Sequence, residues 1–234
     1  MALSDWLKSL SGHYPESARF TPGLRLTKDD SRHFAALWLS EGVPFAFQTV
    51  PAIFQIAREN LAQHLSIPFR DVSMTGSGRI GYSMSPAKFG AVYSSNSDVD
   101  LFIVSERWFE ALSEQAIQFL DDYKEQKISP ANDRQRGFWD DSLLRLPKNI
   151  QQGFLDAKKV SFEHSPAAKA LQKAADRFRY DVNQLSAAQT VKDASIRAYK
   201  DWNSAISQIA FNVRKALEFW EPVKDQAEGA GPIG

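Results

Sequence analysis

Cysteine is absent from the 234 residues of the chain. A disulfide framework, a zinc–thiolate site and a thiol nucleophile are therefore excluded. The four histidines (His13, His33, His64 and His164) form no cluster along the sequence, and we expect His64 to be a core or boundary residue of a helix rather than a ligand. A chain without cysteine suits a reducing compartment, and we expect a cytoplasmic protein.

Long apolar runs are also missing. No run approaches the ~20 residues that a membrane-spanning helix needs, so we expect no membrane insertion. The first residues, MALSDWLKSL, lack a basic start followed by a long apolar core, so no signal peptide is expected. An excess of charge of one sign is missing too, because 28 Lys and Arg residues balance 28 Asp and Glu residues. No overall field draws in nucleic acid or an anionic membrane, although a local basic groove is not excluded.

The remaining composition is that of a globular protein, with 43% apolar and 24% charged residues. Thr49 can cap a helix in which Pro51 occupies the first turn. Residues 79–97 and 124–150 contain prolines and glycines, and we expect a long loop and a broken region there. Apolar residues recur at helical spacing in the segments 51–65, 106–123, 167–182 and 204–220.

Two short strands are expected at residues 70–76 (RDVSMTG) and 98–105 (DVDLFIVS). The segment 190–199 is ambiguous. Its alternation of Asp193, Ser195 and Arg197 with apolar residues suits a strand with one polar face, and a helix fits nearly as well. Helices and short strands together predict an α+β fold with a helical C-terminal part.

The stretch TGSGRIG, residues 75–81, has the G-x-G-x-x-G spacing of a dinucleotide-binding turn. Such a turn opens a helix that holds the pyrophosphate, and the ribose-binding acid follows the apolar run of the second strand. The segment after Gly81 has no apolar stripe and is interrupted by Pro86. Asp98 and Asp100 precede their apolar run. A Rossmann fold is therefore not favoured.

Asp98 and Asp100 are instead spaced for metal binding, because residues two apart in a strand share a face. Two adjacent carboxylates repel each other unless a cation lies between them, and Mg²⁺ prefers oxygen ligands and retains phosphate oxygens. Gly76 permits close backbone approach to a phosphate, and Ser77 can donate a hydrogen bond to it. An Asp-x-Asp or a Gly-Ser turn alone is more often a solvated loop feature, but the combination is much more specific.

The stretch TGSGRIG…SSNSDVDLFIV resembles the nucleotidyltransferase fold of the DNA polymerase beta superfamily. That signature is a Gly-Ser turn, an acid-x-acid on the next strand and a third acid on a later strand. With SEGVPFAF, GSGRIGYSMSPAKFG and IRAYKDW, the chain is similar over roughly residues 37–220 to small bacterial nucleotidyltransferase-like proteins, some of them defence-associated. It resembles more loosely the enzymes that make cyclic or linear nucleotide signals in antiphage immunity. Asp98 lies 22 residues beyond Gly76, a longer loop than in compact members.

The resemblance implies that Gly76 and Ser77 hold a nucleoside or deoxynucleoside triphosphate, and that Asp98 and Asp100 bind two Mg²⁺ or Mn²⁺ ions. For the third acid we choose Asp193, which would join the same sheet face, bind metal and activate the attacking hydroxyl. Its rivals are Asp140 and Asp141.

Further nucleotide contacts are expected among polar and cationic residues, although a solvated surface charge is at least as common for any one cation. Tyr199 and Trp202 could stack on a base, but packing against the last helix is the expected role. The candidate contacts are Ser97, Arg79, Lys88, Arg197 and Lys200.

The expected activity is Mg²⁺-dependent transfer of NMP or dNMP to a hydroxyl, with a nucleotide or oligonucleotide product that signals to a separate effector protein in antiphage defence. The alternatives are nucleotidylation of a protein or RNA, and a catalytically inactive antitoxin-like binding protein. The expected segments are an N-terminal helical or irregular part (1–40), a nucleotidyltransferase core (41–125), a helical part with the third-acid strand (126–222) and a disordered tail (223–234).

Overall fold

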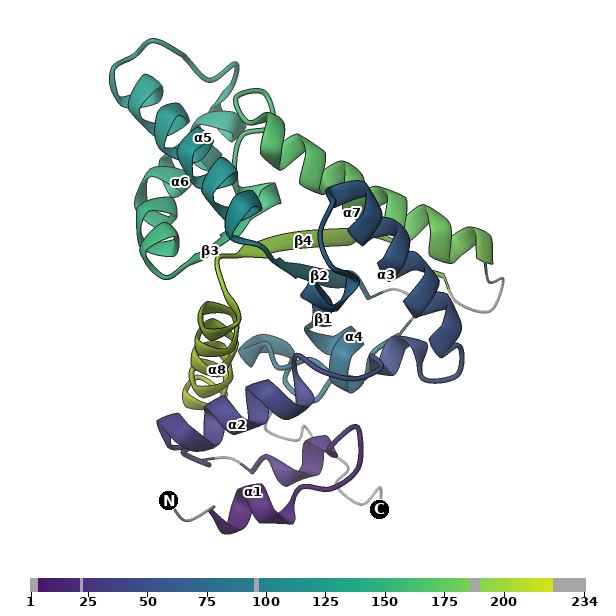
Figure 1. Ribbon diagram of the computed structural model, residues 1–234. Helices are drawn as coiled ribbons and strands as arrows, with labels where there is room; N and C mark the ends of the chain where they lie inside the picture. Colours follow the sequence, from purple (N-terminus) through teal and green to yellow (C-terminus); the bar gives the residue numbers. More distant parts are fainter. Residues whose placement is uncertain (1–3, 22, 95–96, 186–189, 221–234) are drawn as a thin grey trace, which may run out of the picture.

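A four-stranded mixed sheet lies at the centre of the computed structural model, which describes residues 4–21, 23–94, 97–185 and 190–220 (Figure 1). The strands lie in the order β1-β2-β4-β3, with β2 parallel to β4 and the other neighbours antiparallel. The expected α+β class is confirmed, and the ambiguous segment forms a strand. The strand bounds are β1 (Val72–Thr75), β2 (Val99–Val104), β3 (Phe154–Asp156) and β4 (Ala194–Tyr199).

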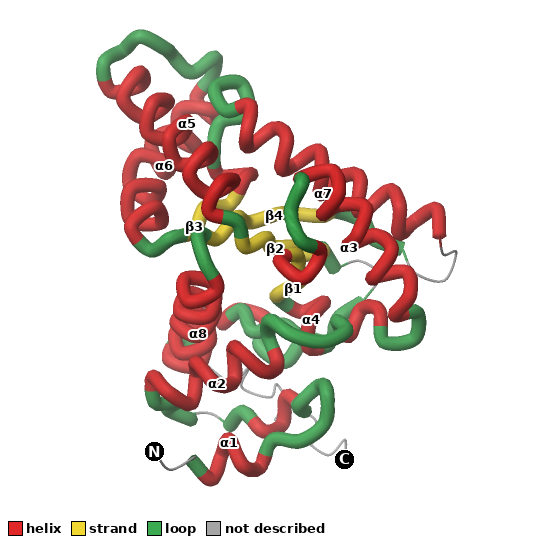
Figure 2. The backbone as a smooth tube through the Cα atoms, in the orientation of Figure 1, coloured by secondary structure: helices red, strands yellow, loops and turns green. Residues whose placement is uncertain are grey.

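Helices surround the sheet on both faces (Figure 2). Their bounds are α1 (Asp5–Ser9), α2 (Lys28–Trp38), α3 (Pro51–Leu65), α4 (Ser77–Ile80), α5 (Glu106–Lys124), α6 (Asp133–Gln151), α7 (Pro166–Leu185) and α8 (Trp202–Glu218). Short 3₁₀ turns lie at Ser17–Arg19, Phe45–Phe47, Phe69–Asp71, Pro86–Lys88 and Ala157–Lys159.

One face of the sheet is apolar along its whole length. Met74 of β1, Leu101 and Ile103 of β2, and Ile196 and Ala198 of β4 are buried on this face. Helices α3, α5 and α7 cover it with their own apolar stripes. Each large apolar side chain buried here stabilises the fold by about 1.5–3 kcal/mol, so this face forms the main core.

The opposite face changes character along the strands. At one end Phe102, Phe154 and Tyr199 are buried in a second apolar cluster with residues of α2 and α8. The polar Asp100 lies on this face of β2, two residues before Phe102. Ser195 lies on this face of β4, four residues before Tyr199, and pairs in register with Asp100. Because side chains alternate along a strand, the residues that build this second core also place a polar patch beside it.

Helix α8 is held in place beside this patch by its cap. The side chain of Asp201 accepts a hydrogen bond from the backbone N–H of Ser204 at 2.7 Å, and this bond lowers the pKa of Asp201. A carboxylate at this position also complements the positive end of the helix dipole. The expected apolar stripe of α8 packs as predicted, with Ile209 and Val213 buried and Trp202 partly buried.

Two predictions near α3 are wrong. The helix begins at Pro51 as expected, but its N-cap is Val50 rather than Thr49, and Val50 supplies no side-chain hydrogen bond. The proline itself fits the first helical position, where a missing N–H costs little. His64 is exposed rather than part of the core or its boundary.

The predicted broken region at 124–150 is instead occupied largely by α6, which contains Pro147. Asn132 caps this helix by accepting a hydrogen bond from the backbone N–H of Gln135 at 2.9 Å. Proline in a helix removes one backbone hydrogen bond. Trp139 and Leu146 are almost fully buried, and their burial offsets that loss.

The division of the chain into four segments stays a prediction, but two of these segments contribute strands to the same sheet. Strands β1 and β2 come from residues 41–125, and β3 and β4 come from residues 126–222. The tail predicted at 223–234 lies outside the described residues. Among the helices of the described ranges, none combines the length and the apolar character that crossing a bilayer requires.

Candidate functional site

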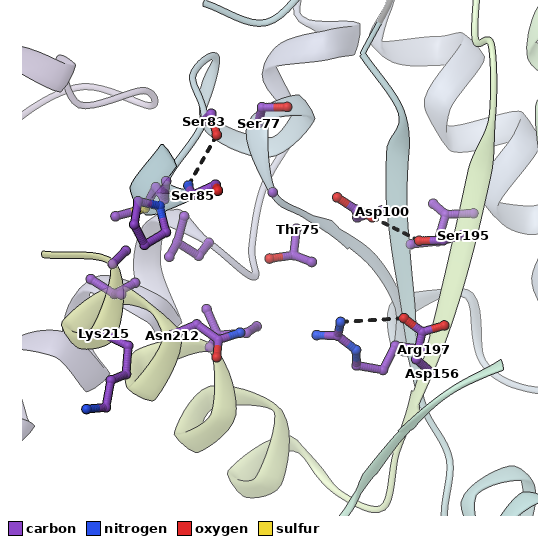
Figure 3. A pocket seen from close by; sticks show the side chains of 18 of the residues that line it. Thr75, Ser77, Ser83, Ser85, Asp100, Asp156, Ser195, Arg197, Asn212 and Lys215 are labelled. Atoms are coloured by element: carbon purple, nitrogen blue, oxygen red, sulfur yellow. Dashed lines mark hydrogen bonds and ion pairs between the residues drawn. The ribbon is translucent and has the colours of Figure 1, made fainter. Parts of the chain in front are cut away.

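A pocket of about 480 Å³ opens on the polar end of the second sheet face (Figure 3). Strands β1, β2 and β4 form its floor, and the turn at residues 83–86 forms one side. Helix α8 forms the other side, with Asn212 and Lys215 among its polar lining residues and Ile209 and Val213 among its apolar ones. The pocket therefore joins a charged floor to a partly apolar wall, a combination that is common in small-molecule sites.

Gly76 ends β1 and lies directly against the carboxylate of Asp100. Thr75 pairs in register with Asp100, so the next residue reaches the edge of the sheet beside that side chain. Gly76 has φ +73° and ψ −160°, a conformation that is essentially restricted to glycine. A Cβ atom built on Gly76 would lie 2.6 Å from Oδ2 of Asp100. Close backbone approach at Gly76, which the sequence predicts for a phosphate, is made here to a carboxylate.

Ser77 follows as the first residue of α4 and lines the pocket. Helix α4 is only four residues long and ends at Gly81, so the long helix that a Rossmann turn requires is not formed. The predicted loop thus begins with one helical turn. Gly81 has φ +94°, and a Cβ there would lie 2.8 Å from the ring of Phe45. This glycine fixes the turn against Phe45 rather than freeing the loop.

Asp100 occupies the centre of the pocket floor. Its Oδ1 accepts a hydrogen bond of 2.9 Å from the hydroxyl of Ser195. The residue is exposed at the pocket surface, but the protein atoms packed around its carboxyl raise the pKa of Asp100, and the neighbouring charges of Asp156 and Asp98 act in the same direction. The hydrogen bond from Ser195 and the charge of Arg197 oppose that rise. The carboxylate still faces the pocket, so a cation could reach it and stabilise its charged form.

Asp98 lies one residue before β2 and is exposed. It is absent from the pocket lining and makes no ion pair with another residue of the described ranges. Its charge is nevertheless close enough to Asp100 to contribute to the raised pKa of that carboxyl. Ser97 is half-buried, and its hydroxyl accepts a hydrogen bond from the backbone N–H of Ser94 at 3.2 Å. Ser97, a predicted nucleotide contact, does not line the pocket.

Asp193, the predicted third acid, is not brought to the pocket. It lies just before β4, and its Oδ2 is 2.6 Å from Nζ of Lys158. The hydrogen bond from Lys158 lowers the pKa of Asp193. The rival acids lie on α6, where Asp140 accepts a hydrogen bond from Tyr123 and Asp141 pairs with Arg145. None of the three lines the pocket.

Asp156 is the acid that sequence reasoning missed. It ends β3, pairs in register with Arg197 and lines the pocket. One of its carboxylate oxygens lies 3.7 Å from the guanidinium of Arg197. The three residues of β3 are too few for a periodic pattern, so the sequence offers only the weak signal of an acid after Phe154 and Leu155.

The predicted cations separate into different environments. Arg197 lines the pocket and lies over the ring of Phe154, whereas Arg79 is buried and donates a hydrogen bond of 2.6 Å to the carbonyl of Val43. Burial lowers the pKa of Arg79 to about 10. Lys88 is exposed beside the pocket but does not line it. Arg197 is the predicted cation that the fold brings to Asp100.

Lys200, Tyr199 and Trp202 follow Arg197 in the chain but do not line the pocket. Lys200 pairs with Glu106 at 3.5 Å, away from the pocket. Tyr199 is buried and donates a hydrogen bond of 2.7 Å to Gln208, and Trp202 packs edge-on against Phe102. Both aromatic residues therefore pack rather than present a face for stacking, as expected.

The divalent cation that the resemblance implies at Asp98 and Asp100 stays a prediction. Carboxylate oxygens are donors that such an ion accepts, but only Asp100 of the two lines the pocket. No group of three or more acidic or imidazole side chains that could hold a metal occurs within the described ranges. Asp156 lies beside Arg197 and Asp193 beside Lys158. The expected pair of ions stays a prediction, because a second ion would need one of these acids to leave its present partner.

Comparisons with protein families, with curated proteins and with solved structures found no match to the chain. The function of the pocket is therefore inferred from its own residues and from the motifs that they form.

Proposed function

We propose that the chain is a nucleotidyltransferase that binds a nucleoside triphosphate, as its complex with a divalent cation, in the pocket beside Asp100. The observation that carries the proposal is the contact between Gly76 and Asp100, which joins the two halves of the motif at one place. These residues are 24 positions apart in the sequence. Thr75, which precedes Gly76, pairs in register with Asp100 across β1 and β2, and this supports a single site rather than two unrelated loop features.

The residues of the pocket have complementary roles in this proposal. Ser77 donates a hydrogen bond to the triphosphate, and Arg197 and Lys215 neutralise part of its charge. Asp98 and Asp100 hold the cation that accompanies the triphosphate. The apolar side of α8, with Ile209 and Val213, contacts the sugar or base. Phosphoryl transfer depends mainly on positioning and charge neutralisation, and these residues can supply both.

In the proposed reaction, a hydroxyl oxygen attacks the α-phosphorus and forms a new phosphorus–oxygen bond. The bond between the α-phosphorus and the bridging oxygen breaks, pyrophosphate leaves with the electron pair, and the hydroxyl proton passes to solvent. A divalent cation at this site would lower the pKa of the hydroxyl and neutralise charge on the phosphates. Arg197 sits beside the same carboxylate and would hold the phosphates in line.

The resemblance of the motifs to signal-producing nucleotidyltransferases supports a nucleotide or oligonucleotide signal as the product, recognised by a separate effector in antiphage defence. Transfer of the nucleotide to a protein or RNA uses the same chemistry and is distinguished by its product. A soluble oligomer supports the first product class, and a labelled macromolecule supports the second.

A catalytically inactive binding protein is the second candidate. Two observations favour it: Asp156, the only acid besides Asp100 among the described residues that line the pocket, faces Arg197, and Ser195 stands opposite Asp100 on β4. Such a protein would hold a nucleotide without transferring it. Binding and turnover therefore have to be measured separately.

The test is to incubate the purified chain with each of the common ribo- and deoxyribonucleoside triphosphates and Mg²⁺ or Mn²⁺, and to measure pyrophosphate release. Nucleotide binding is measured in parallel by calorimetry, with and without a chelator. Asp98→Asn and Asp100→Asn are the test variants, and Asp29→Asn on α2 is the matched control.

Release of pyrophosphate that Asp100→Asn abolishes and Asp29→Asn leaves unchanged supports the transferase. Cation-dependent binding without release supports the inactive binding protein. If no nucleotide binds and no pyrophosphate is released, both candidates are wrong.

A further inference from the structure

A second groove lies between α2 and α8, which pack against each other (Figure 1). It has a volume of about 670 Å³ and is distinct from the nucleotide pocket, although both use residues of α8. We call it the α2–α8 groove and define it by six of its lining residues: Lys28, Arg32, Asn203, Gln208, Phe211 and Arg214.

Three cations converge on this groove, and the structure fixes two of them. The guanidinium of Arg32 donates hydrogen bonds to Ser207 at 2.6 Å and to Asn203 at 3.0 Å. The guanidinium of Arg214 donates a hydrogen bond of 2.6 Å to the hydroxyl of Ser31. Both arginines are half-buried, so their charges are held at defined positions rather than dispersed in solvent.

These cations lack carboxylate partners. Within the described ranges, Lys28, Arg32 and Arg214 form no salt bridge, although eleven salt bridges occur elsewhere in those ranges. Asp29 is the one acid that lines the groove, and it forms no salt bridge with the three cations. Lys28 and Arg32 are also four residues apart on α2, a spacing at which like charges are destabilising. An anion in the groove would relieve this repulsion.

The groove also offers an aromatic surface. Phe211 lines it and is 44% exposed, so part of its ring is accessible to a ligand in the groove. An exposed ring beside cations that fit phosphates suits a base attached to a sugar-phosphate backbone. The amide of Asn203 lies at the same groove and could contact a sugar or a base edge.

We propose that the α2–α8 groove binds single-stranded nucleic acid, with phosphates at Lys28, Arg32 and Arg214 and a base stacked on Phe211. The overall charge of the chain is zero, so the attraction is local and falls as salt increases. The site is distinct from the nucleotide pocket, because none of the residues that line the groove lines that pocket.

One residue connects the groove to the nucleotide pocket. Gln208 lines the groove, and its side-chain oxygen lies 2.7 Å from the hydroxyl of Tyr199 and 3.3 Å from Nη1 of Arg197. Arg197 in turn lines the pocket. A strand bound in the groove would therefore lie against the back of the pocket wall.

The test is the fluorescence anisotropy of a short fluorescein-labelled single strand of mixed sequence, titrated with the full chain at several salt concentrations. Lys28→Gln and Arg214→Gln should each weaken binding and reduce its salt dependence, since each removes a phosphate contact. Phe211→Ala should weaken binding ~10-fold through lost stacking. Lys28 makes no hydrogen bond through its side chain to another described residue, so Lys28→Gln should fold normally even if Arg214→Gln does not.

The matched controls are Arg136→Gln on α6 and Phe162→Ala, an exposed arginine and an exposed phenylalanine outside the groove. Both should bind like the unaltered chain. Asp100→Asn should also keep its affinity for the strand, which separates this site from the nucleotide pocket. Unchanged binding in Lys28→Gln and Phe211→Ala, or equal binding of a duplex of the same sequence, would overturn the proposal.

Discussion

Gly76 and Asp100 lie so close together that a side chain at position 76 would displace the Asp100 carboxylate, because a Cβ there would lie 2.6 Å from its Oδ2. The carboxylate is held by the sheet register and by the hydroxyl of Ser195, so it cannot move aside without losing its hydrogen bond. A glycine turn and an acid from the neighbouring strand therefore form one unit of the candidate site.

The first prediction concerns Gly76→Ala, which should impair folding and nucleotide binding together. Its backbone conformation costs a non-glycine residue about 1–3 kcal/mol, and the clash with Asp100 adds to this. Gly12→Ala is the control, because Gly12 shares the φ of +73° but has no atom within 4 Å of its added Cβ. Chemical denaturation should show a larger loss of stability for Gly76→Ala, and equal losses would contradict the contact.

The second prediction concerns the pH dependence that Asp100 confers. Burial raises its pKa in the folded chain above the ordinary value of 3.8. A raised pKa means that the folded state binds the proton more tightly, so the stabilisation is complete below pH 3.8 and is lost as pH rises through the folded pKa. Asp100→Asn removes the titrating carboxyl, so the variant does not lose this stabilisation as pH rises. The variant should be at least as stable as the unaltered chain at neutral pH, with the difference shrinking in acid.

Urea denaturation of both proteins across this range checks the prediction, with Asp29→Asn as the control for an exposed acid. A variant that is less stable than the unaltered chain at neutral pH and equally stable in acid would show the opposite sign and contradict it.

The third prediction distinguishes the acids that could complete the site. Asp156→Asn should reduce nucleotide turnover because Asp156 lines the pocket, whereas Asp193→Asn should leave it nearly unchanged. Asp193→Asn should instead cost up to ~1 kcal/mol at neutral pH, as an exposed salt bridge does. Its lowered pKa places this stabilisation above pH 3.8, and it is lost as pH falls through the folded pKa. Loss of turnover only in Asp193→Asn would restore it as the third acid.

The fourth prediction separates two arginines. Arg197→Gln should weaken triphosphate binding ~10-fold or more, since a charged hydrogen-bond partner of the ligand is lost. Arg79→Gln should lower the melting temperature without a specific effect on binding, because Arg79 holds the carbonyl of Val43. Calorimetric titration and thermal melts of both variants provide the comparison, and an exchange of the two outcomes would reverse the assignment.

The part of the site formed by the glycine turn and by β2 could be predicted from the sequence, because each of these features depends on residues that are neighbours in the chain. The apolar run that forms β2, the glycine turn and the position of Asp100 all follow from neighbouring residues. Asp156 could not be predicted, because β3 is recognisable only through its pairing with β4. Arg79 is buried against the carbonyl of Val43, whereas Arg197 lines the pocket. The sequence does not reveal which of two arginines the fold buries.

The same distinction explains the errors in the fold. Helix α6 was hidden by Gly137 and Pro147, since propensity weighs against a helix that only the burial of Trp139 and Leu146 can support. The alternation along β4, in contrast, correctly placed Ser195 and Arg197 on one face, but Asp193 lies before the strand and pairs with Lys158 outside the pocket.

The segment between Gly81 and Tyr93 leaves the sheet and returns to its starting point. The backbone N–H of Tyr93 donates to the carbonyl of Gly81 at 2.8 Å, and Tyr82 forms a bridge with Val92. The long separation between the glycine turn and the acids is thus taken up by an arm that closes on itself. Because residues 83–86 of this arm line the pocket, insertions or deletions near Lys88 should alter that side of the pocket without moving Gly76 away from Asp100. Related chains could therefore differ widely in arm length while keeping the same contact between glycine and carboxylate.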